Sequence, residues 1–213
     1  GDFDPSFEIR KLSAKETADR RDEVFKALPI ARTEYVVECS GQEGTQAFLN
    51  AIQNYALLRG IQSNLYKCFL PTVWRVGAGV QGILHPEGTY DDPKGGELRR
   101  ALYPRLTAHY QFINELKLFS ENDHHTKFSI NLYRREGVAV RFDHIANLFD
   151  PATIDSSYVH AGGGETPGIK RDEGGWQTAG HRNRIIEVDE TVLATFAKLY
   201  DELMEPTMYD QWL

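Results

Sequence analysis

Short apolar runs of strand length, separated by one segment with helical spacing, constrain the fold of this chain most strongly. Residues 80–84 (VQGIL) form a short apolar run that residues 85–88 (HPEG) end abruptly, and residues 128–133 (FSINLY) alternate cleanly between apolar and polar. Residues 112–119 and 138–142 repeat this alternation in part. Residues 97–110 carry leucines at helical spacing, so we expect a helix there. Strands and a helix in this order predict an α/β domain.

The two ends of the chain are expected to surround that domain. Ser13 and Glu16 have the spacing of a capping box and predict a helix that continues to Leu28, where Pro29 ends it. A short strand is expected over residues 34–39. We therefore divide the chain into an N-terminal helical extension (1–43), the α/β part (44–158), and a glycine-rich loop with a C-terminal helix that leads to a next domain (159–213).

The composition is that of an ordinary globular protein. The chain has 213 residues, of which 41% are hydrophobic and 26% are charged, and no apolar run reaches the length of a membrane span. The N-terminus does not resemble a signal peptide, and two cysteines are too few for a disulfide framework, so we expect a cytoplasmic protein. The net charge of −7 argues against a dedicated nucleic-acid-binding module, although residues 94–135 hold eight basic and four acidic side chains.

Four motifs carry a resemblance to a known family. They are NLYKCFLPTVW (64–74), VQGILHPEGTY (80–90), HYQFINELKLF (109–119) and LKLFSENDHHTKFSINLY (116–133). In order and spacing they resemble the large bacterial type II restriction-modification enzymes that methylate adenine N6 in DNA. The resemblance implies a partial Rossmann-like methyltransferase sheet, with its antiparallel edge strands, for the α/β part. It also implies S-adenosylmethionine as cofactor, double-stranded DNA as partner, and further domains of the same polypeptide.

The catalytic motifs of that family are not found in this chain. The family holds the adenine amino group with an Asn-Pro-Pro-aromatic tetrapeptide and binds the cofactor on a glycine-rich turn after its first strand. Neither occurs here, since residues 162–164 (GGG) do not follow a convincing strand. We therefore expect both motifs to lie upstream in a longer protein. The chain by itself is expected to have no catalytic residue, to bind no cofactor or metal, and to be inactive.

Phe119 is the strongest candidate site residue. The resemblance implies that an aromatic at this position stacks on the adenine that swings out of the duplex. The alternative is a phenylalanine of the hydrophobic core.

The polar loop after Phe119 holds the next candidates. His124, His125 and Lys127 are expected to contact DNA phosphate, with Lys127 foremost. His124 and His125, with Asp123 and Glu121, also offer ligand types that zinc accepts. Adjacent side chains in a strand or tight loop point apart, however, so we favour a polar loop over a metal site.

Two other interpretations stay open. Asp91 or Asp92, with Glu115 and Lys117, could form the acidic and basic set of a Mg²⁺-dependent nuclease, provided that residues 115–117 lie on a strand. The chain could also be a non-catalytic DNA-contacting scaffold. Lys170 and Arg171 in the glycine-rich loop are further candidates for DNA contact, although a flexible connector is the simpler interpretation of that loop.

Overall fold

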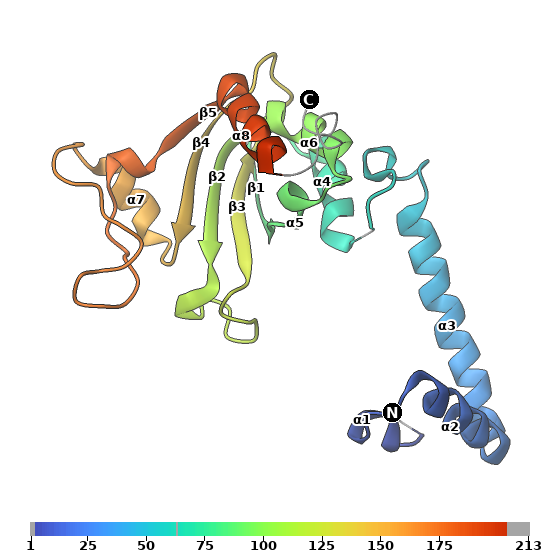
Figure 1. Cartoon of the computed structure of the whole chain (residues 1–213). Coiled ribbons are helices and arrows are strands. Elements are labelled where there is room, and N and C mark those ends of the chain that lie inside the picture. Colours follow the sequence, from blue (N-terminus) through green and yellow to red (C-terminus); the bar gives the residue numbers. More distant parts are fainter. Residues whose placement is uncertain (1–2, 63, 204–213) are drawn as a thin grey trace. The chain divides into compact units, whose positions relative to one another are not determined.

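The computed structural model describes residues 3–62 and 64–203, which belong to two compact units (Figure 1). One unit extends to Ala51 and the other begins at Ile52. The predicted boundary between residues 43 and 44 lies inside a helix of the first unit. Among the described residues, none of the helices is both long and apolar enough to cross a membrane.

The N-terminal unit consists of helices α1 (Ser6–Ile9), α2 (Ala14–Ala27) and α3 (Pro29–Asn50). The predicted capping box is confirmed, because the Ser13 side chain accepts from the Glu16 backbone and the Glu16 side chain accepts from the Ser13 backbone. The strand predicted over residues 34–39 is wrong, since this segment lies inside α3. Pro29 ends α2 as expected but also opens α3, because a proline in the first helical turn needs no backbone partner.

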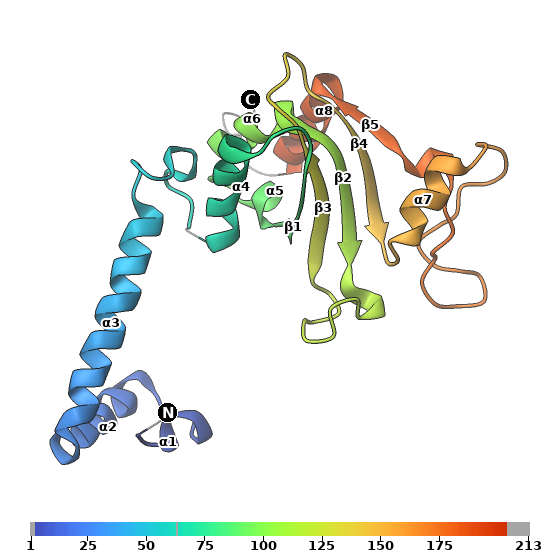
Figure 2. The same cartoon turned by 180° about the vertical axis from the view of Figure 1, so that it is seen from behind.

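The second unit is built on a mixed five-stranded sheet, which confirms the α/β class (Figure 2). The strands are β1 (Gln81–Pro86), β2 (Leu106–Ile113), β3 (Lys127–Tyr133), β4 (Arg141–Leu148) and β5 (Ile186–Asp189). Their order is β1-β3-β2-β4-β5. β3 runs antiparallel to β1 and β2, β4 runs parallel to β2, and β5 runs antiparallel to β4.

Each face of the sheet carries an apolar cluster. On one face Tyr133, Phe142 and Val188 pack with residues of α4 (Leu65–Val76), α6 (Gly96–Leu102) and α8 (Glu190–Leu203). On the other face Ala108, Tyr110, Phe112, Phe128, Ile145 and Leu148 pack together, with Ile154 of α7 (Ala152–Val159) against them. Alternation along β2 and β3 explains both clusters, because successive side chains point to opposite faces. The short helix α5 (Gly88–Asp91) follows β1.

Two of the predicted segments around β2 are corrected. The helix expected over residues 97–110 ends at Leu102, and Pro104 lies in the 3₁₀ turn η2 (Tyr103–Arg105) before β2 begins. Proline cannot donate a helical hydrogen bond, and half of the residues of β2 are β-branched or aromatic, namely Thr107, Tyr110, Phe112 and Ile113. The strand expected over residues 112–119 ends at Ile113, where the 3₁₀ turn η3 (Asn114–Leu116) starts.

The remaining elements agree with the sequence pattern more closely. The strand expected over residues 138–142 appears later, as β4. The glycine-rich segment between α7 and β5 is irregular apart from an isolated antiparallel bridge between Lys170 and Trp176 and the 3₁₀ turn η4 (Arg182–Arg184). Another such turn, η1 (Ala56–Leu58), precedes α4. Asp189 accepts from the Val192 backbone at 2.9 Å and so caps α8 as predicted. The last ten residues of the predicted C-terminal region lie outside the described residues.

Candidate functional site

The strand directions bring the candidate residues to one end of the sheet. Pro86 at the end of β1 pairs with Phe128 at the start of β3, and Ile113 at the end of β2 pairs with Lys127. The loop between β2 and β3, residues 114–126, therefore extends from the end where β1 and β2 finish (Figure 1). Polar side chains gathered at the carboxyl ends of strands are typical of ligand sites in α/β sheets.

Asn114 fixes the shape of this loop. Its side chain is fully buried, and its amide oxygen accepts from the Phe119 backbone at 2.9 Å. Its amide nitrogen donates to the Phe119 carbonyl at 2.8 Å and to the Asp123 carbonyl at 3.2 Å. The chain can turn sharply there because Lys117 adopts a left-handed conformation with φ of 53°. One side chain thus positions both halves of the loop.

Phe119 lies at the surface beside the apolar cluster. Its ring is edge-on to Phe128 at a centroid distance of 4.9 Å, and Phe128 stacks on Phe112 at 5.3 Å. Phe119 is 39% exposed, whereas Phe112 is fully buried and Phe128 is 6% exposed. An aromatic that is supported on one side and exposed on the other can accept a flat ring.

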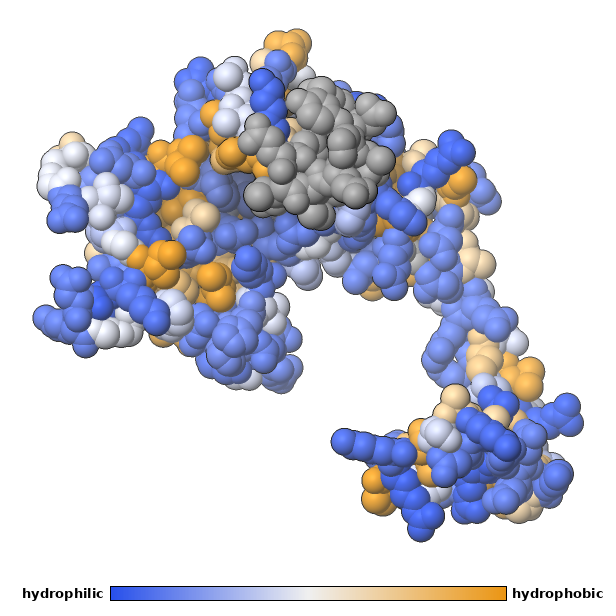
Figure 3. All heavy atoms as spheres, in the orientation of Figure 1, coloured by the Kyte–Doolittle hydropathy of each residue, from blue (hydrophilic) through white to orange (hydrophobic). Residues whose placement is uncertain are grey.

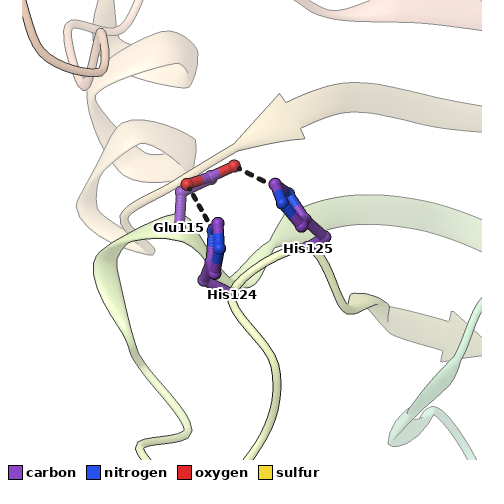
Figure 4. Close-up of side chains that lie close together, drawn as sticks. All are labelled: Glu115, His124 and His125. Atoms are coloured by element: carbon purple, nitrogen blue, oxygen red, sulfur yellow. Dashed lines mark hydrogen bonds and ion pairs between the residues drawn. The ribbon is translucent and has the colours of Figure 1, made fainter.

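His124 and His125 point toward one carboxylate, that of Glu115 (Figure 4). Nδ1 of His124 lies 3.1 Å from Glu115 Oε2, and Nδ1 of His125 lies 3.3 Å from Oε1. The two imidazole centroids are 3.8 Å apart. The expectation that adjacent side chains point apart is therefore wrong. The cause is a tight turn, in which Asp123 accepts the His125 backbone N–H at 2.8 Å and bends the chain between the two residues.

A buried carboxylate, that of Glu87, follows β1 and contacts β2. Glu87 is 5% exposed, with His109 Nε2 at 3.1 Å from Oε1 and Gln111 Nε2 donating to Oε2 at 2.9 Å. Burial raises the pKa of Glu87, but the contacts with His109, Ser129 and Gln111 outweigh burial and lower it to about 2. Glu87 is therefore ionised throughout the physiological range and ties β1 to β2.

Aromatic and imidazole rings surround His109 and extend this polar network across the sheet. Tyr90 of α5 lies 4.4 Å from His109 between ring centroids and donates to Asn131 of β3 at 2.6 Å. His144 of β4 stacks on His109 itself, with ring centroids 4.8 Å apart. Burial first, and then the His109 charge, lower the pKa of His144 to about 4, so this imidazole is neutral near pH 7.

The acidic residues of the nuclease interpretation do not converge. Asp92 is paired with Lys67 at 2.5 Å, and burial, with the nearby Glu87 charge, raises the pKa of Asp91. Glu115 and Lys117 lie in and after the turn η3 instead of on a strand, and Lys117 Nζ donates to the Asn122 carbonyl at 3.0 Å. The arrangement that this interpretation requires, with residues 115–117 on a strand, is absent from the described residues.

Lys170 and Arg171 lie on a different loop from the histidines and Lys127. Lys170 Nζ is 5.1 Å from the centre of the Trp176 ring, and Trp176 stacks on Phe149, directly after β4, at 4.6 Å. Because β4 and β2 are parallel, Phe149, on which Trp176 stacks, lies at the same end of the sheet as the start of the Phe119 loop. Both loops present a mainly hydrophilic surface (Figure 3). Lys127 is exposed at the start of β3.

Sequence reasoning proposed Phe119 and the two histidines as site residues, and it did not anticipate the contacts that Asn114, Glu115 and Glu87 make. The sequence feature that could have identified Glu87 is its position directly after an apolar strand and a proline.

Comparison with known proteins adds no assignment. No protein-family model matches the chain, and no curated protein matches its sequence.

Proposed function

We propose that this chain is part of an adenine-N6 DNA methyltransferase of the restriction-modification type, in which it forms one wall of the pocket for the flipped base. In this proposal the reaction of the longer protein is methyl transfer from S-adenosylmethionine to adenine N6 in double-stranded DNA. The chain supplies no catalytic group of its own. Phe119 stacks on the target adenine, and Lys127 with the Lys170 and Arg171 loop contacts DNA phosphate.

The position of β3 is the observation that carries the proposal. The resemblance implies a strand, a helical segment, a second strand, a polar loop and an antiparallel strand. β1, α5 with α6, β2, residues 114–126 and β3 follow in that order, and β3 lies between β1 and β2, antiparallel to both. The polar loop with Phe119 is then at the end where parallel strands of such sheets bind ligands.

The free edge of β1 is consistent with a sheet that continues. Among the described residues β1 pairs with β3 alone, so the hydrogen-bonding groups on its other edge have no strand partner. Leu84 of β1 is 51% exposed, and Val80, the residue directly before β1, is 65% exposed. Unpaired apolar edges are unusual in finished sheets. In the proposed protein, upstream strands that carry the Asn-Pro-Pro-aromatic motif pair with this edge.

The test uses the full-length protein. Its sequence upstream of this chain should contain an Asn-Pro-Pro-aromatic motif, and the purified protein should transfer labelled methyl groups from S-adenosylmethionine to adenine N6. Base–aromatic stacking contributes on the order of 1–3 kcal/mol, so Phe119→Ala should lower the methylation rate by about 5- to 150-fold, whereas Phe119→Tyr should retain most of it.

Leu118→Ala is the matched control, since Leu118 is 41% exposed and is the neighbour of Phe119 in the same loop. It should leave the rate nearly unchanged. An upstream sequence without the motif, or a full-length protein that methylates no adenine, contradicts the proposal. Equal rates for Phe119→Ala and wild type contradict the stacking role alone.

A further inference from the structure

We infer that Glu115, His124 and His125 form a binding site for a divalent transition-metal ion such as Zn²⁺. The three side chains come from the two ends of the loop, and one ligand atom from each lies within 4.8 Å of the other two (Figure 4). This site is separate from Phe119 and does not depend on the methyltransferase proposal.

The distances fit ligands that share one ion. Zinc holds histidine nitrogen and carboxylate oxygen at about 2.0–2.2 Å, and with tetrahedral angles two such ligands are about 3.3 Å apart. The Nδ1 atoms of His124 and His125 lie 3.1 and 3.3 Å from the Glu115 oxygens. The imidazole side chains are 45% and 73% exposed, so they can rotate onto an ion without disturbing the core.

The protein holds the ligand-bearing segments in place before an ion arrives. Glu115 follows the buried Asn114, and its carboxylate side chain is only 13% exposed. The turn with the histidines is closed by the Thr126 backbone donating to Asp123 at 3.1 Å, and the Asn114 backbone donates to Thr126 at 3.0 Å. The two segments are therefore already joined, and an ion has little loop entropy to overcome.

The ligand types indicate which ions bind. Two imidazoles with one carboxylate suit Zn²⁺, Co²⁺, Ni²⁺ or Cu²⁺, whereas Mg²⁺ and Ca²⁺ require mainly oxygen ligands. With neutral imidazoles the set carries a charge of about −1, which partly balances a divalent cation. Three protein ligands leave at least one position of a tetrahedral ion for water or for an external oxygen such as that of a phosphate.

Titration calorimetry of this chain with ZnCl₂ tests the site, with MgCl₂ as the ion that should not bind. We expect one Zn²⁺ per chain. Glu115→Gln, His124→Ala and His125→Ala should each weaken binding by more than about 100-fold, because loss of even an outer-shell partner costs roughly 10- to 100-fold. Co²⁺ should bind in place of Zn²⁺ with visible absorption bands that each variant abolishes.

His160→Ala is the matched control, because His160 also stands beside another histidine, with His181 at 4.1 Å between centroids. Both ring nitrogens of His181 already contact backbone groups, namely the Gly163 carbonyl and the Asn183 N–H, so this pair offers no comparable site. His160→Ala should bind Zn²⁺ like wild type. Two results would overturn the inference. One is that the wild-type chain binds no Zn²⁺ at about 1 mM, a concentration at which even a weak specific site is half occupied. The other is that Glu115→Gln, His124→Ala and His125→Ala all bind Zn²⁺ as tightly as the wild type does.

Discussion

Replacing Glu87 by glutamine removes one negative charge from the interior while keeping the shape of the side chain. Glu87 joins β1 to two residues of β2, since it contacts both His109 and Gln111. The carboxylate side chain is 6% exposed, so solvent screens these contacts very little. The neutral amide that Glu87→Gln introduces makes at best a weaker hydrogen bond than the carboxylate does. Its amide hydrogens also face side chains that are arranged to donate, such as that of Gln111.

The pKa of Glu87 gives the size of the effect. A pKa lowered from 4.5 to about 2 corresponds to about 3 kcal/mol of stability near pH 7. Because the folded pKa lies below the unfolded one, this contribution is fully present above about pH 5. It is lost as the pH falls from 4.5 through about 2, and about 1 kcal/mol of it is gone at pH 4. Glu87→Gln should therefore be about 3 kcal/mol less stable than wild type at pH 7, and the difference should shrink by about 1 kcal/mol at pH 4.

Urea unfolding monitored by tryptophan fluorescence measures this difference, since Trp74 packs against the apolar cluster of the sheet. Glu97→Gln is the matched control, because Glu97 is 63% exposed and forms an ion pair with Arg100, which is 58% exposed. It should change the free energy of unfolding by less than about 1 kcal/mol at either pH. A loss below 1 kcal/mol for Glu87→Gln (about the worth of an ordinary hydrogen bond), or a difference that does not change with pH, would refute the reasoning.

Asn114→Ala should cost about 1–3 kcal/mol, because it leaves buried backbone groups of the Phe119 loop without their partner, and limited proteolysis should then cut that loop faster. Lys67→Met should cost about 3–5 kcal/mol in urea unfolding, because it leaves the Asp92 carboxylate unpaired in a partly buried place, and adding Asp92→Asn should recover part of the loss. Gly180→Ala should cost at least about 1–3 kcal/mol in thermal unfolding, because a Cβ there collides with the backbone of α7, whereas Gly163→Ala, which meets open space, should cost little.

The sequence predicts the strands of this unit best where alternation and burial agree. Residues 128–133 were expected as a strand and form β3 with one more residue, because apolar and polar side chains there face two different layers. Residues 97–110 were expected as one helix, and Pro104 instead separates α6 from β2. Leucine spacing alone did not separate a helix from a turn followed by a buried strand, since short apolar runs are compatible with both.

The candidate site was predictable only in part, for a related reason. Phe119 was proposed as a site residue because a resemblance pointed to it, and its role stays a prediction. Asn114 acts through bonds to backbone groups five to nine residues later, which no local pattern reveals. The contact between Glu115 and His124 depends on the fold of the same loop. The two residues are nine positions apart in the sequence, so no local pattern predicts that contact.

Two neighbouring residues at the end of β2 therefore control two different properties of one loop. Asn114 points inward and sets the position of Phe119, whereas Glu115 faces the two histidines. If the histidines bind a metal ion through Nδ1, they no longer contact phosphate directly, and the ion contacts it in their place through its open position. Lys127 and the Lys170 loop then remain as the direct basic contacts. In the proposed methyltransferase, removal of Zn²⁺ should therefore weaken DNA binding by the wild type but not by His124→Ala. Phe119→Ala should lower the methylation rate in both the wild-type and the His124→Ala background.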